Sequence, residues 1–127
     1  MSQDQLFDDG LAVRKEVLGS DYVEKSLANA DAFTMPFQEW TTKYCWGTLW
    51  TRPYLPRKTR SLINVAMLTA IGKPNEVRLH VRGALNNGCT PEEIREALLH
   101  AAVYAGIPAA MEGFKVAHEV LKEEGVL

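Results

Sequence analysis

The 127-residue sequence predicts an all-α protein of six to seven helices. Three observations lead to this prediction. Apolar residues recur at helical spacing along most of the chain, and glycine or proline stands at nearly every point where that spacing breaks. No run of alternating β-branched residues competes with it. Because the sequence holds no internal repeat and no flexible linker, we expect a single domain over residues 1–127.

The N-terminal part of the chain predicts three helices followed by a loop. Apolar residues over 4–18 form one loose helical face that ends at a glycine, and a capping Ser-Asp pair opens a short helix over 20–28. A third helix is expected over 36–46, where aromatic residues gather near one side. Two prolines and a glycine interrupt the segment 47–56, so it predicts an ordered, aromatic-rich loop.

The remaining chain predicts four more helices with clear ends. The segment 57–71 is apolar on nearly every side, which is typical of a buried helix. The next helix is expected over 75–87, with Gly88 at its C-terminal cap. A capping box begins at Thr90 and opens a helix that runs to Ala105, and Pro108 starts the last one. A helix that is apolar all round needs more cover than so small a chain provides, so we expect a homo-oligomer.

Composition and charge exclude several classes of function. The net charge is −2 and no cluster of Lys and Arg stands out, which argues against partners such as nucleic acids or anionic membranes. No apolar run approaches the roughly 20 residues that a membrane helix needs, and the N-terminus has no signal-peptide pattern. We therefore expect a cytoplasmic protein. The two cysteines, Cys45 and Cys89, have no metal-ligand spacing, and no glycine-rich phosphate loop occurs, so neither a metal nor a nucleotide cofactor is expected.

His80 is the most informative candidate residue. Val77 and Ala84 flank it at helical spacing, so it faces the packed side of its helix, and Glu76 lies one turn before it. The carboxylate raises the pKa of an imidazole, whereas burial lowers it, and such a pair can transfer a proton near neutral pH. A histidine held in the core by a helical ion pair is an equally natural explanation of this spacing, and the more frequent one.

Arginines and tryptophans supply the other candidates. Arg52, Arg57 and Arg60 fall within nine residues around the proline-containing loop, and guanidinium groups hold carboxylates in two-pronged geometry. Trp46 and Trp50 can wall a pocket for a flat ring, although such residues more often belong to a core or an interface.

Four segments of the sequence resemble the carboxymuconolactone decarboxylase family. Three are helical, 60–68, 75–88 and 90–110, and are typical of the wider alkylhydroperoxidase-like (AhpD-like) superfamily. The fourth, 46–57 with its Trp-Gly and Trp-Thr-Arg-Pro pattern, is similar to the branch that acts on 4-carboxymuconolactone. Superfamily members that reduce peroxides use a Cys-x-x-Cys-x-x-x-His motif. When the histidine of this motif is aligned with His80, Lys73 and Glu76 occupy the two cysteine positions, so no dithiol can form.

The resemblance implies an AhpD-like helical bundle, assembled as a hexamer, that decarboxylates without a cofactor. The small-molecule substrate would be 4-carboxymuconolactone and the product β-ketoadipate enol-lactone, in the protocatechuate branch of aromatic degradation. His80 would then donate a proton or bind the oxyanion, with Glu76 orienting it. An arginine among Arg52, Arg57 and Arg60 would bind the carboxymethyl arm. Trp46 and Trp50 would exclude water.

Two alternatives from other classes remain open at this point. A superfamily member could act as a thiol-dependent peroxidase through Cys45 or Cys89, or the chain could be a non-catalytic oligomeric binding module. A helix-turn-helix interpretation of residues 92–110 is the least favoured, because the chain lacks a basic recognition face.

Overall fold

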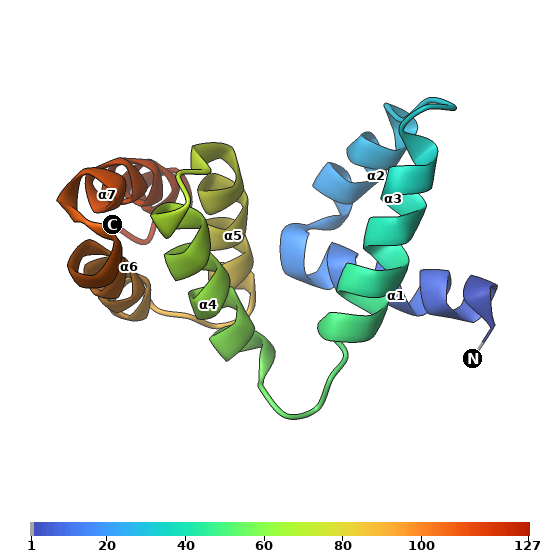
Figure 1. Cartoon of the computed structure of the whole chain (residues 1–127), viewed down its shortest axis with the longest axis horizontal. Coiled ribbons are helices and arrows are strands. Elements are labelled where there is room, and N and C mark those ends of the chain that lie inside the picture. The colour runs from blue at the N-terminus through green and yellow to red at the C-terminus, as the bar shows by residue number, and fades with distance from the viewer. Residues whose placement is uncertain (1) are drawn as a thin grey trace. The chain divides into compact units, whose positions relative to one another are not determined.

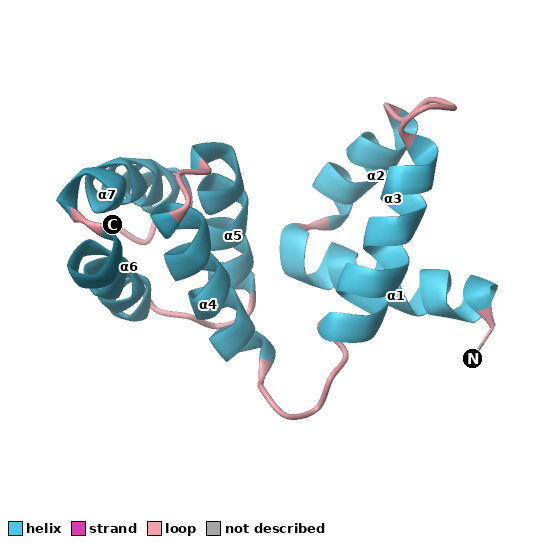
Figure 2. Ribbon diagram, viewed as in Figure 1, coloured by secondary structure: helices cyan, strands magenta, loops and turns pink. Residues whose placement is uncertain are grey.

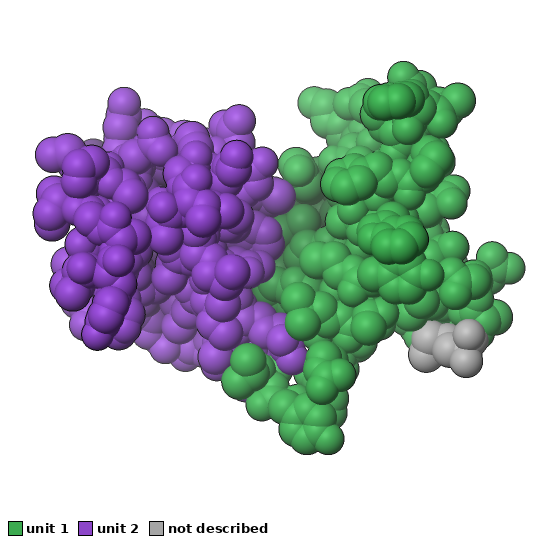
Figure 3. All heavy atoms as spheres, in the orientation of Figure 1, with its two compact units in different colours: residues 1–55 green, residues 56–127 purple. Residues whose placement is uncertain are grey.

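The computed structural model describes residues 2–127, and every regular element in that range is a helix (Figures 1 and 2). The all-α prediction is therefore confirmed. The chain divides into two compact units, residues 1–55 and 56–127, which Figure 3 shows in different colours. The division falls inside the segment predicted to be a loop.

Unit 1 contains four consecutive helical elements. They are α1 (Gln3–Leu18), α2 (Ser20–Ala28), α3 (Met35–Trp40) and the π-helix η1 (Thr41–Leu49). The prediction that a loop begins at Gly47 is wrong, because the π-helix continues through that residue to Leu49. The wider π-helical turns put Gly47 against α1, where a side chain on Gly47 would meet the backbone of Leu6. Packing against α1 thus keeps Gly47 in a helical conformation, although the local sequence predicts that the helix ends there.

Unit 2 is a four-helix unit that buries its own core. Its helices are α4 (Arg57–Ala70), α5 (Pro74–Asn86), α6 (Pro91–Ala105) and α7 (Ile107–Glu123). The core is built from the inner faces of all four, with side chains such as Val65, Val81, Ile94 and Val120 fully buried. The predicted capping box is confirmed, since Thr90 and Glu93 exchange both of its hydrogen bonds.

Helix α4 is not buried on all sides, contrary to the prediction from its composition. Ser61, Val65 and Thr69 form its buried face, whereas the side chains of Ile63 and Met67 are 40% and 58% exposed. The apolar residues of α4 therefore divide between a face that packs into the core and a face that is exposed.

Candidate active site at the α4–α5 helix pair

Helices α4 and α5 are joined by a tight turn and carry polar side chains along their shared seam. Near one end, the amide nitrogen of Asn87 donates to the hydroxyl of Ser61 at 2.9 Å and approaches the carbonyl oxygen of Arg57 at 3.5 Å. Further along, the amide nitrogen of Asn64 lies 3.5 Å from Nδ1 of His80. The N-terminal half of α4 therefore lies beside the C-terminal half of α5, with His80 at the centre of the seam.

His80 stands half-buried in this seam, as its spacing between Val77 and Ala84 predicted. Those two neighbours are fully buried, whereas Glu76 is exposed one turn before His80. Burial lowers the pKa of His80 below its ordinary value of 6.5, and the charge of Glu76 acts in the opposite direction without cancelling it. The neutral imidazole is therefore the favoured form in the folded protein.

The lowered pKa of His80 predicts a loss of stability in mild acid. A group with a depressed native pKa binds fewer protons in the folded than in the unfolded chain, so its contribution is complete above pH 6.5 and disappears as the pH falls toward the native pKa. Urea unfolding at about pH 7.5 and about pH 5.5 measures this loss. The variant His80→Gln, which does not titrate, should lose less stability over that interval, and equal losses would contradict the assignment.

The first turn of α4 concentrates positive charge. It carries Arg57, Lys58 and Arg60 and no acidic residue, although helix N-termini ordinarily favour anions. Lys58 is paired with Glu93 at 2.9 Å, and both arginines are half-buried. Arg60 lies one turn before Asn64 on α4, so both residues lie on the face of the helix that borders the seam containing His80. This end of the helix suits a ligand with carboxylate groups.

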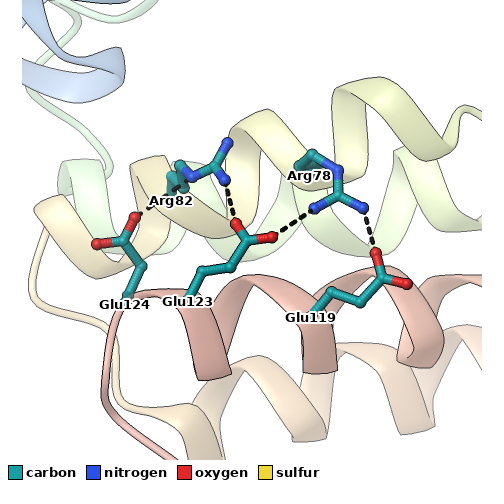
Figure 4. A network of polar contacts seen from close by, with 5 residues as sticks. All are labelled: Arg78, Arg82, Glu119, Glu123 and Glu124. Atoms are coloured by element: carbon teal, nitrogen blue, oxygen red, sulfur yellow. Dashed lines mark hydrogen bonds and ion pairs between the residues drawn. The ribbon is translucent and has the colours of Figure 1, made fainter.

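The arginines on either side of His80 in sequence are held by α7 (Figure 4). Arg78 pairs with Glu119 and lies 3.5 Å from Glu123, and Arg82 contacts Glu123 at 2.5 Å and Glu124 at 3.3 Å. These side chains are partly exposed, so each pair contributes at most about 1 kcal/mol. The network fastens α7 to α5. Arg78 and Arg82 therefore serve a structural contact between two helices in this unit.

The remaining predicted site residues belong to unit 1. Trp46 and Trp50 are only 4% and 3% exposed and stack on each other with their rings 4.9 Å apart. Arg52 is exposed, with its guanidinium 5.7 Å from the centre of the Tyr54 ring. Their roles toward a substrate stay predictions from the sequence.

Neither cysteine has the surroundings of a reactive thiolate. Cys89 is buried, its thiol donates to the carbonyl oxygen of Lys58, and burial raises its pKa to about 11. Burial also raises the pKa of Cys45, although Arg14 lies close enough to oppose the shift. Thiol chemistry needs the thiolate, which both environments disfavour at neutral pH.

Other features of the described residues lie apart from the His80 seam. An apolar pocket of about 190 Å³ opens between α6 and α7, lined in part by Leu98, Phe114 and His118. None of the predicted site residues lines it. Across residues 2–127, no three His, Cys, Asp or Glu side chains gather closely enough to hold a metal ion. No helix in this range is long and apolar enough to cross a membrane.

Comparison with known proteins places this chain in a family. The model of the carboxymuconolactone decarboxylase family matches residues 36–119. The chain is 44% identical to the 4-carboxymuconolactone decarboxylase of Acinetobacter baylyi, over 99% of this chain and 94% of that protein. It is 50% identical to the nitrosuccinic acid decarboxylase npaB of Metarhizium robertsii, over 94% of this chain and 83% of that protein.

These matches define a class of enzyme, the decarboxylases, or carboxy-lyases. The chain belongs to the carboxymuconolactone decarboxylase family, as the resemblance in its sequence predicted. The peroxidase and binding-module alternatives are not favoured by the relatives or by the surroundings of the two thiols.

Asn64 is the residue of the seam that sequence reasoning missed. A polar side chain inside an otherwise apolar helix usually has a specific partner, and that signal was available in the sequence. The partner was not, since it lies on a different helix.

Proposed function

We propose that this enzyme decarboxylates 4-carboxymuconolactone to β-ketoadipate enol-lactone in protocatechuate degradation, with the reaction at the α4–α5 seam. The observation that carries the proposal is the half-buried imidazole of His80, in contact with Asn64 on the same helix pair as a turn rich in arginine. Near full-length similarity to an enzyme of that name supports the choice of substrate.

The chemistry requires little beyond positioning, because the substrate contains its own electron sink. The bond between the ring γ carbon and the carboxylate breaks, and CO₂ leaves. The electron pair moves through the ring double bond to the lactone carbonyl oxygen, giving a dienolate. One proton then adds at the α carbon, so the balance is substrate plus one proton giving enol-lactone plus CO₂. No electron is gained or lost, so the reaction as written calls for no redox cofactor.

The residues of the seam match the three needs of this reaction. Arg57 and Arg60 offer guanidinium groups for the carboxymethyl arm, which stays on the product. His80 supplies either a hydrogen bond to the dienolate oxygen or the proton for carbon, and Glu76 biases its charge. A donor directed at the developing oxyanion is worth about 3–4 kcal/mol of barrier.

Nitrosuccinate is a second candidate substrate, favoured by the 50% identity to the decarboxylase that bears that name. It too is a dicarboxylate in which an electron-withdrawing group can accept the electrons left by CO₂. The same arginines and the same neutral donor would serve a nitronate oxygen in place of a lactone oxygen. The two substrates therefore differ in shape and not in the class of step.

Turnover of the two substrates side by side tests the proposal. Purified protein in a chelating buffer without thiol is given freshly prepared 4-carboxymuconolactone or nitrosuccinate, and CO₂ release and product are followed. We expect faster turnover of the lactone, unchanged in a Cys45→Ala/Cys89→Ala double variant. Turnover of nitrosuccinate alone would move the enzyme to the second substrate. Failure with both would contradict the proposed function.

We also propose that the enzyme is a cytoplasmic homo-oligomer, a hexamer by family resemblance. Support comes from apolar side chains that the chain leaves uncovered on α6 and α7, among them Val103 and Tyr104 at 78% and 83% exposure. Analytical ultracentrifugation measures the mass directly, and a monomer at micromolar concentration would contradict the proposal.

A further inference from the structure

The contact between Asn64 and His80 joins two helices. The atom of Asn64 nearest to the ring is its amide nitrogen, 3.5 Å from Nδ1 of His80. One or two turns away, the Asn87–Ser61 bond at 2.9 Å holds the same two helices together. Two separate polar links therefore connect α4 and α5, and only one of them involves the histidine.

The chemistry of the two atoms favours one position for the proton of His80. An amide nitrogen donates hydrogen bonds and does not accept them, so Nδ1 must present its lone pair to Asn64. A neutral imidazole with a bare Nδ1 carries its hydrogen on Nε2. Protonating Nδ1 would bring two N–H groups against each other. The contact thus favours one tautomer over the other and the neutral ring over the imidazolium.

We propose that Asn64 is a positioning residue that keeps His80 in the Nε2–H tautomer, so that His80 acts as a neutral hydrogen-bond donor to the oxyanion. This inference rests on the proposed function and deepens it, because it assigns His80 to the dienolate oxygen. The burial that lowers the pKa of His80 acts in the same direction. A neutral donor stabilises an oxyanion without the cost of holding a full positive charge in a half-buried seam.

The substitution Asn64→Asp tests the proposal by reversing the direction of the hydrogen bond. A carboxylate only accepts, and it also raises the pKa of the imidazole, so the comparison is made at a pH where the ring is neutral. There the carboxylate draws the proton to Nδ1 and leaves Nε2 without a hydrogen. We expect kcat to fall about 10²-fold, the loss typical of one missing oxyanion donor, with a much smaller change in KM. In Asn64→Ala neither tautomer is imposed, and we expect a loss of about five-fold, the rate equivalent of one ordinary hydrogen bond.

Nitrogen NMR of the histidine rings reads the tautomer without any substrate. Protein labelled with ¹⁵N in histidine should show the hydrogen of His80 on Nε2 in the native enzyme, on Nδ1 in Asn64→Asp, and distributed between both in Asn64→Ala. The His80 signal is assigned by its absence from His80→Gln.

The matched control is Asn87→Ala, which removes the other link between α4 and α5. If Asn64 only held the helices together, Asn87→Ala would lower kcat and disturb the tautomer as much as Asn64→Ala. We expect it to leave the tautomer unchanged. A native His80 with its hydrogen on Nδ1, or a tautomer that no Asn64 variant moves, would overturn the inference even if the lactone is turned over. Absence of turnover with the expected tautomer would instead count against the proposed function.

Discussion

Replacing His80 with alanine is expected to lower kcat for decarboxylation by about 10²–10⁴-fold while the helices stay folded. The expectation follows from the position of the imidazole, half-buried in the α4–α5 seam with Nδ1 facing Asn64, where the ring can place a single N–H on a developing negative charge. The loss should appear in kcat more than in KM, because the charge that His80 meets exists only in the transition state.

A matched control separates this loss from a general effect of removing an imidazole. His118 is exposed on α7 and lines the pocket between α6 and α7, apart from the seam. We expect His118→Ala to keep native turnover. If His80→Leu, which has no hydrogen-bond donor, keeps the native circular dichroism and also keeps native kcat, then His80 is not the donor and the site must lie elsewhere.

The largest expected effect on stability comes from Gly10→Ala in unit 1. A methyl group at Gly10 would overlap the backbone carbonyl oxygen of Thr42 and stand 2.9 Å from the backbone nitrogen of Gly47. Both obstacles are backbone atoms of the π-helix η1, so neither can turn aside. We expect the free energy of unfolding of unit 1 to fall by about 3 kcal/mol, at the upper end of overpacking effects.

Tryptophan fluorescence measures this effect selectively, because the three tryptophans of the chain, Trp40, Trp46 and Trp50, all lie in unit 1. Helix propensity alone would make Gly10→Ala stabilising by about 1 kcal/mol. The sign of the change in the free energy of unfolding therefore shows whether propensity or steric overlap with η1 dominates. The control Ala12→Gly, at an exposed position of α1, should cost about 1 kcal/mol through propensity only. A gain of stability in Gly10→Ala would contradict the close contact between α1 and η1.

The helices with strong local signals were predictable from the sequence, and those shaped by packing were not. The ends of α6 follow from the Thr90 capping box and from Gly106, which adopts φ +113°, a conformation that favours glycine. By contrast, η1 runs through Gly47 because the helix rests on α1, more than thirty residues earlier in the chain. The local sequence of η1 does not indicate that α1 packs against it.

The candidate site shows the same division. The inward direction of His80 followed from the helical spacing of Val77 and Ala84, and both of these neighbours are buried. The direction in which the pKa of His80 shifts could not be predicted from the sequence. Burial lowers this pKa and the charge of Glu76 raises it, and only the fold sets how deeply the ring is buried. The contact with Asn64 joins residues sixteen apart on two helices, so it required the packing of α4 against α5.

Decarboxylation of 4-carboxymuconolactone in D₂O tests the central claim most directly. If CO₂ leaves to give a dienolate that is protonated at the α carbon, the product should be the enol-lactone with one deuterium at that carbon. Mass spectrometry and proton NMR of product collected early in the reaction locate the label. An isomeric lactone that keeps the ring double bond in place and carries deuterium at the γ carbon, or product formed without any solvent hydrogen, would contradict the dienolate mechanism and the role it gives to His80.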